Sequence, residues 1–121
     1  MRLQGPAKRL TIFIGESDRY RHHSLCSEII DRARRAGLAG CSVFRGTAGF
    51  GATGHLHTAH LLSLSEDLPV AIVIIDEPDR IEEFVPQLDE LVTGGLVILD
   101  DVDIIRYVAN RERRSGSSKE S

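Results

Sequence analysis

The stretch VAIVII at residues 70–75 decides the fold, because none of its side chains is polar. A strand that is apolar on both faces has to be covered on both sides of its sheet. The run RLTIFI at residues 9–14 predicts a second such strand, in which Phe13 lies opposite three Leu and Ile side chains. Two strands of the predicted sheet therefore carry apolar side chains on both faces.

A first helix is predicted after the strand at residues 9–14. Apolar side chains recur at helical spacing over residues 25–36. Ser24 can cap the start of this helix, and Gly37 is well placed to end it. A short second strand is predicted at residues 41–45.

A second helix is predicted directly after residues 70–75. Asp76 can cap it, Pro78 suits its first turn, and an apolar stripe runs over residues 81–92. Pro86 interrupts this stripe and removes a backbone hydrogen bond, which predicts a kink in the helix.

Gly94 and Gly95 end this helix, and residues 96–99 begin a last strand that we expect to continue irregularly to Val108. The predicted order is strand, helix, strand, long loop, strand, helix, strand. In a chain of this length, that order fits an α+β, ferredoxin-like βαββαβ sandwich. Such a fold has four mostly antiparallel strands and two helices on one face of the sheet.

The apolar surplus of this sheet predicts self-association. Two helices cover only one face, whereas the strands at residues 9–14 and 70–75 are apolar on both. An exposed apolar patch of that size is rare on a monomer. Contact between copies of the chain is the simplest way to cover it.

The chain has 121 residues and a net charge of −3, with 41% hydrophobic and 27% charged residues. This composition is typical of a globular domain and offers no basic surface for nucleic acid. We expect one domain over residues 1–110 and a polar, disordered tail over residues 111–121. Neither a signal peptide nor a membrane-spanning stretch is apparent, and Cys26 and Cys41 lack paired spacing, so reduced thiols in a cytoplasmic protein are expected.

Residues 46–54, GTAGFGATG, concentrate four glycines in a long predicted loop. The segment lacks the lysine of a phosphate-binding P-loop. It matches the dinucleotide pattern GxGxxG, but a weak helix follows it and four strands are too few for a doubly wound fold. Two interpretations stay open, a loop whose backbone closely approaches an anionic ligand and a plain flexible connection.

Three histidines follow these glycines, His55, His57 and His60. No regular structure presents all three on one side, so a metal site and solvated loop histidines are both open. Glu16 and Asp18 are interpreted as surface acids. No hydrolase or metalloprotease motif is present, and the sequence predicts no enzyme.

The stretch GLAGCSVFRGTAGFGATGHLHTAH at residues 37–60 resembles the region of PII signalling proteins that leads into their long T-loop. A closer resemblance is to a PII-like family, the domain of unknown function 190. It covers nearly all of residues 8–108. The motifs that carry it are GESD at 15–18, GLAG at 37–40, RGTAGFG at 45–51, HTA at 57–59, LSEDLPV at 64–70, FVPQLDELV at 84–92 and DVDIIRY at 101–107.

This resemblance implies a homotrimer with ligands in three clefts between subunits, at the base of the T-loop. It also implies a non-enzymatic signalling protein that binds a small ligand, AMP, ADP or ATP, and regulates a transporter or an enzyme through the T-loop. Arg106 on the last strand would hold phosphate through its planar set of donors. The other residues that the resemblance places near the nucleotide are Ser42, Gly49, Phe50, Gly51, Ala52, Thr53, Gly54, Gly94 and Gly95.

Three features of the PII pattern are missing here. Gly94 and Gly95 are followed directly by Leu96, so the lysine of the PII phosphate loop has no counterpart. Ala52 and Thr53 replace the glutamine that follows GFG, and no tyrosine lies in the loop. A mononucleotide or a different anion is therefore open as the ligand. The alternative function is a divalent-metal-binding trimer similar to the CutA-like proteins, which would use the three loop histidines.

Overall fold

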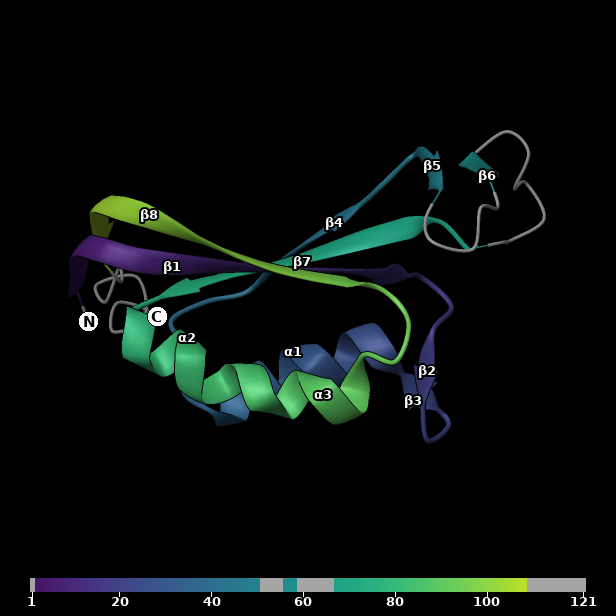
Figure 1. Cartoon of the computed structure of the whole chain (residues 1–121), viewed down its shortest axis with the longest axis horizontal. Helices are drawn as coiled ribbons and strands as arrows, with labels where there is room; N and C mark the ends of the chain where they lie inside the picture. Colours follow the sequence, from purple (N-terminus) through teal and green to yellow (C-terminus); the bar gives the residue numbers. More distant parts are fainter. Residues whose placement is uncertain (1, 51–55, 59–66, 109–121) are drawn as a thin grey trace, which may run out of the picture.

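The computed structural model describes residues 2–50, 56–58 and 67–108. Its main feature is an antiparallel sheet in the order β4-β7-β1-β8, with all helices on one face (Figure 1). The elements of these two layers are β1 (Arg2–Gly15), α1 (Leu25–Arg35), β4 (Ser42–Arg45), β7 (Pro69–Asp76), α2 (Pro78–Phe84), the 3₁₀ helix η1 (Val85–Gln87), α3 (Leu88–Leu91) and β8 (Leu96–Val108). The predicted ferredoxin-like α+β sandwich is confirmed.

Two short strand pairs, which the sequence did not predict, lie at the right-hand end of Figure 1. They are β2 (Arg19–Tyr20) with β3 (His23–Ser24), and β5 (Ala48–Phe50) with β6 (Leu56–Thr58). The turn between β2 and β3 places Arg21 and His22 at φ 50° and 74°. Such hairpin turns usually carry Asn or Gly, so no local signal marks this one.

The core lies between the sheet and the helices. Alternate side chains of β1 and β7 point toward the helical layer, as the pleat of a strand requires. Each fully buried Leu, Ile or Phe side chain contributes about 1.5–3 kcal/mol relative to an exposed one. The fully buried apolar side chains are Leu10, Ile12, Ile29, Ile72, Ile74, Ile81 and Phe84.

Helix α1 begins and ends as predicted. The Ser24 hydroxyl accepts a hydrogen bond from the Ser27 N–H at 3.2 Å, which caps the first turn. Gly37 follows the helix with φ 78°, a conformation that favours glycine. The following strand, β4, begins one residue later than the predicted Cys41.

The second helix differs from the prediction at two points. Asp76 is not the capping residue, because it is the last residue of β7 and Glu77 occupies the N-cap position. Pro86 does more than kink the helix, since the α-helix ends at Phe84 and resumes at Leu88. A proline cannot donate the α-helical hydrogen bond, and the 3₁₀ helix η1 bridges this interruption.

The strands β1 and β8 are longer than predicted. β1 begins at Arg2 rather than Arg9, and β8 pairs with β1 as far as Val108, with the irregularity that the sequence predicted. A single register shift occurs between the pairs at Leu3 and Gly5, where Gly5 has φ 98°. Each strand is stabilised by the other, which local sequence does not reveal.

The face of the sheet opposite the helices is apolar and exposed. Phe44 is 59% exposed, Leu96 53% and Phe13 38%. We call this surface the open face, and its apolar members, from the strand register, are Phe13, Phe44, Ala71, Val73, Ile75, Leu96 and Ile98. The predicted apolar surplus is therefore present on the folded chain.

Cys26 and Cys41 are free thiols that pack at the edge of the core. Burial raises the pKa of both thiols, so both are held in the protonated, poorly nucleophilic form. Among the described residues, no helix combines the length and the apolar character that a membrane crossing requires.

Candidate functional site

The glycine-rich segment leaves the sheet at the end where β4 stops and β7 starts. Gly46 donates its backbone N–H to the Pro69 carbonyl at 2.7 Å. A Cβ on Gly46 would lie 2.6 Å from the Pro69 ring, so only glycine allows this approach. Gly49, on β5, lies against the same ring. The glycines thus let the two arms of the segment pack closely on each other.

The turn at residues 15–18 joins this base from the end of β1. The Ser17 N–H donates to the Asp67 carboxylate at 2.6 Å, and the Glu16 N–H donates to the Leu68 carbonyl at 2.8 Å. A Cβ on Gly15 would overlap the Asp67 carboxylate. Two motifs of the sequence, GESD and LSEDLPV, therefore meet in space.

Arg45, the last residue of β4, forms an ion pair with Glu16 in the same turn. The Arg45 side chain is 63% exposed and that of Glu16 is 38% exposed. An exposed pair of this kind contributes less than about 1 kcal/mol to stability. The contact therefore orients the guanidinium beside the glycine segment more than it stabilises the fold.

Gly94 and Gly95 lie at the same end of the sheet, between α3 and β8. Gly95 has φ 152°, and a Cβ there would lie 2.5 Å from the Phe13 carbonyl oxygen. No atom lies within 4 Å of a Cβ placed on Gly94. The chain thus needs glycine at position 95 to enter β8, whereas position 94 tolerates a side chain.

Arg106 lies far from these glycines within one protomer. The strand β8 pairs Leu96 with Phe13 at the loop end of the sheet and Val108 with Arg2 at the other end. At about 3.3 Å per residue, Arg106 lies about 30 Å along β8 from Leu96. A site that contains both the glycines and Arg106 needs a second copy of the chain.

Ser42 occupies a third place, at the start of β4, opposite Val73. The predicted Phe50 is described only as a backbone position of β5, and His57 only as one of β6. The other predicted residues lie outside the described chain, namely Gly51, Ala52, Thr53, Gly54, His55 and His60. Within residues 2–50, 56–58 and 67–108, no group of three or more His, Cys, Asp or Glu side chains could hold a metal ion.

Sequence reasoning missed the roles of three charged residues, Glu16, Arg45 and Asp67. The sequence favours reading Glu16 and Asp18 as a pair of surface acids, but they have separate structural partners. Asp18 accepts from the Gly15 N–H at 3.0 Å, while Glu16 binds Arg45. No local signal marks these contacts, because the partners are 29 and 50 residues apart in sequence.

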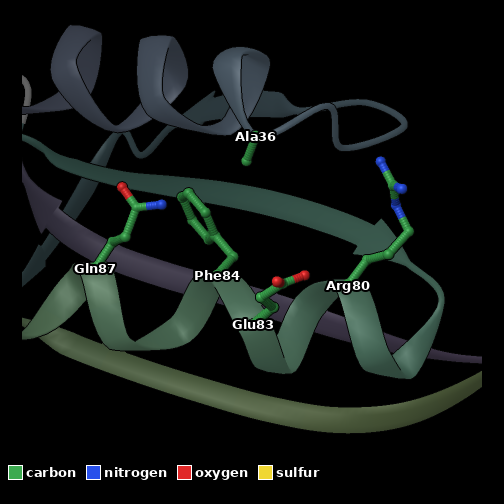
Figure 2. A pocket seen from close by; sticks show the side chains of 5 residues that line it. All are labelled: Ala36, Arg80, Glu83, Phe84 and Gln87. Atoms are coloured by element: carbon green, nitrogen blue, oxygen red, sulfur yellow. The ribbon is translucent and has the colours of Figure 1, made fainter.

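The helical layer has a separate shallow pocket of about 250 Å³ between α1 and α2 (Figure 2). Phe84 lies between the two helices, and the pocket is lined by Arg80 and Glu83 of α2 and by Gln87 of η1. Arg80 is already occupied, because its guanidinium donates to Asp76 at 3.2 Å and to the Gly37 carbonyl. None of the predicted ligand residues that the structure describes lines this pocket.

A polar cluster ties β2 to the helices beside that pocket. The Tyr20 hydroxyl donates to the Glu90 carboxylate at 2.5 Å, and Arg32 lies 3.5 Å from the same carboxylate. The Tyr20 hydrogen bond and the Arg32 charge hold the pKa of Glu90 below its usual value of 4.5. The Glu90 side chain in this cluster is 57% exposed, so the cluster fastens the turn of β2 and β3 to the helices rather than forming a closed site.

The family described as DUF190, Uncharacterized ACR, matches residues 7–104 of the chain. A UPF0166 protein of Aquifex aeolicus is 35% identical over 98 residues, which are 81% of this chain and 92% of the relative. A UPF0166 protein of Methanocaldococcus jannaschii is 30% identical over 101 residues, which are 83% of this chain and 93% of the relative.

Solved structures with the same fold are PII-like. CPII from Thiomonas intermedia K12, bound to ADP and bicarbonate, aligns with a TM-score of 0.59 and 19% identity, covering 82% of this chain and 88% of CPII. A PII-like signalling protein from Thermus thermophilus aligns with a TM-score of 0.61 and 15% identity, covering 84% of this chain and 91% of that protein. At these identities, the likeness concerns the fold. The chain belongs to the DUF190 family and has a PII-like fold.

Proposed function

We propose that the protein is a non-enzymatic, PII-like signalling protein. In this proposal, three copies assemble through their open faces and bind an adenine nucleotide in the clefts between subunits. Ligand binding then changes the conformation of the T-loop, residues 47–67. Through this loop the protein regulates a partner in the cytoplasm, which is a transporter or an enzyme.

The open face is the observation that carries the proposal. Phe13, Phe44 and Leu96 are each more than one third exposed on a surface built from regular strands. Large apolar patches of this kind mark sites of protein contact. The Arg9–Asp100 ion pair at 2.7 Å borders the patch on β1 and β8, which gives it the polar rim typical of an interface.

The separation of the predicted ligand residues supports clefts between subunits. Gly49 and Gly95 lie at one end of the sheet, whereas Arg106 lies about 30 Å along β8. A ring of subunits can bring the loop end of one copy to the β8 end of the next. The arginine of one subunit would then meet a phosphate held by the glycines of its neighbour.

An adenine nucleotide is the ligand class that the structural neighbours favour. CPII was solved with ADP and bicarbonate, and in another structure with ADP, AMP and acetate. The chain keeps the glycines that allow close approach to an anion but has no lysine after Gly95. We therefore expect AMP or ADP to bind more tightly than ATP.

The proposed ligand residues are Ser42, Gly49, Phe50, Gly51, Ala52, Thr53, Gly54, Gly94, Gly95 and Arg106. Residues 1–110 are proposed to form the single domain, and the tail at residues 111–121 is expected to be dispensable for ligand binding. The metal-binding alternative rests on His55, His57 and His60, whose side chains lie outside the described part of the chain.

Two measurements on the full chain test this function. Light scattering at micromolar concentration should give the mass of a trimer, and isothermal titration should detect AMP, ADP or ATP binding with one site per subunit. Arg106→Gln should weaken binding about tenfold or more, because it removes a charge-assisted contact. A monodisperse monomer, or no heat with any of the three nucleotides, would contradict the proposal.

A further inference from the structure

The turn at residues 15–18 contacts both arms of the segment that carries the glycines. It reaches the departing arm through the Glu16–Arg45 ion pair and the returning arm through the Ser17–Asp67 hydrogen bond. These pairs are separated by 29 and 50 residues in sequence. Both arms therefore contact the same turn, which follows the end of β1.

The two contacts differ in how easily they can be exchanged. The Asp67 carboxylate is half-buried against Gly15 and accepts a short 2.6 Å hydrogen bond from the Ser17 backbone. The neighbouring bond from the Glu16 N–H to the Leu68 carbonyl reinforces this arm. The returning arm is therefore held by a half-buried carboxylate together with a hydrogen bond between two backbone groups.

The contact that joins the departing arm to this turn is an exposed ion pair. Arg45 is 63% exposed, and its described partner is the Glu16 carboxylate. A carboxylate and a phosphate present similar acceptor oxygens to a guanidinium, so a bound phosphate can substitute for Glu16. Arg45 directly precedes Gly46, which has no side chain and packs against Pro69.

We propose that Arg45 is a ligand-binding residue, which releases Glu16 and binds the phosphate of the nucleotide instead. The Glu16 carboxylate then competes with that phosphate for the Arg45 guanidinium. This inference rests on the proposed function, because it assumes a phosphate ligand beside Gly46 and Gly49. It also couples ligand binding to the position of the departing arm. The ligand draws Arg45 away from the turn at residues 15–18, while Asp67 keeps the returning arm in place.

The sign of the Glu16 effect distinguishes this role from a structural one. If Glu16 competes with the ligand, Glu16→Gln should tighten nucleotide binding, by up to about fivefold for an exposed pair. If Glu16 only supports the loop, its loss can only weaken binding or leave it unchanged. Arg45→Gln should weaken binding about tenfold, because a charge-assisted contact to phosphate is lost.

A double-mutant cycle by isothermal titration with ADP tests the exchange directly. In the Arg45→Gln background, Glu16→Gln should have no effect, since the competition needs the guanidinium. Glu83→Gln and Arg34→Gln make the same charge changes on the exposed helical layer and should leave the affinity within about twofold. Thermal unfolding of each variant confirms that the fold is kept.

The outcomes separate this inference from the proposed function. If the wild-type chain binds neither AMP, ADP nor ATP, the proposed function fails and the exchange fails with it. If it binds ADP but Glu16→Gln does not tighten binding, or tightens it equally without Arg45, the exchange alone is wrong.

Discussion

Truncation of Phe44 to alanine should separate the subunits without unfolding them. Phe44 lies on β4 and belongs to the open face, where 59% of it is exposed in the single chain. A phenylalanine buries on the order of 200 Å² when it is fully covered. Complete coverage of the exposed part in the assembly would therefore remove about 120 Å² from water.

At about 25 cal/mol per Å², this area corresponds to about 3 kcal/mol per subunit. Since about 1.4 kcal/mol is a tenfold change in an equilibrium constant, the assembly constant should fall on the order of 100-fold for each chain. The figure is an upper bound, because alanine keeps one carbon of the side chain. The isolated subunit should lose little, because most of Phe44 does not contact its own core.

The assay is sedimentation or light scattering over a dilution series from about 100 µM to about 0.1 µM, which spans typical affinities of stable assemblies. Val43→Ala is the matched control, because Val43 is the neighbour of Phe44 in sequence but points to the other face of the sheet. It should leave the assembly midpoint within a few-fold. Equal dissociation curves for Phe44→Ala and the wild-type chain would refute the interface on the open face.

Three further predictions concern the stability of the fold and the pKa of Glu90. Asp76→Ala should lower the free energy of unfolding, as measured in urea, by about 3 kcal/mol or more. The buried carboxylate accepts hydrogen bonds from the Ala39 N–H at 2.8 Å, the Glu77 N–H at 2.7 Å and Arg80 at 3.2 Å. Gly95→Ala should destabilise by about 2 kcal/mol, since its positive φ and the nearby carbonyl of Phe13 both oppose a side chain. Tyr20→Phe should raise the pKa of Glu90 toward 4.5, as followed by NMR titration.

The substitutions at Asp76 and Gly95 each have a control. Asp79→Ala removes an exposed carboxylate three residues away, on α2, and should change the free energy of unfolding by less than about 0.5 kcal/mol. Gly94→Ala has free space and should be nearly neutral, so equal losses at positions 94 and 95 would contradict the argument from φ.

The lowered pKa of Glu90 also fixes the direction of a pH effect. Because the folded value lies below the unfolded one, the contribution of Glu90 is present above about pH 4.5 and is lost as the pH falls through the folded pKa. Tyr20→Phe should therefore reduce the fall in stability on acidification. An unchanged acid profile would show that the hydrogen bond does not favour the charged carboxylate.

Local signals in the sequence predicted the fold well. The helix over residues 25–36 was found because its spacing and its Ser24 cap are properties of neighbouring residues. The start of β1 was missed, since residues 2–8 have little strand preference and are held by pairing with β8. At Pro86 the sequence predicted a kink, whereas the α-helix ends at Phe84 and a 3₁₀ helix leads to Leu88.

The candidate site, too, was predictable where it depends on residue type and not where it depends on contacts between distant segments. The glycines at positions 46, 49 and 95 were visible because backbone freedom is written in residue type. The partners of Glu16 and Asp67 were not visible, since ion pairs and hydrogen bonds across 29 and 50 residues follow from the meeting of strand ends.

The sequence by itself determined the order of the elements and the excess of apolar side chains, because periodicity and composition need no knowledge of distant residues. Only the tertiary structure decided that Arg45, Glu16 and Asp67 meet at one end of the sheet and that Arg106 lies toward the other. The physical reason is strand register, which decides which residues of distant segments lie next to each other. Register is set by the packing of the whole sheet on its helices.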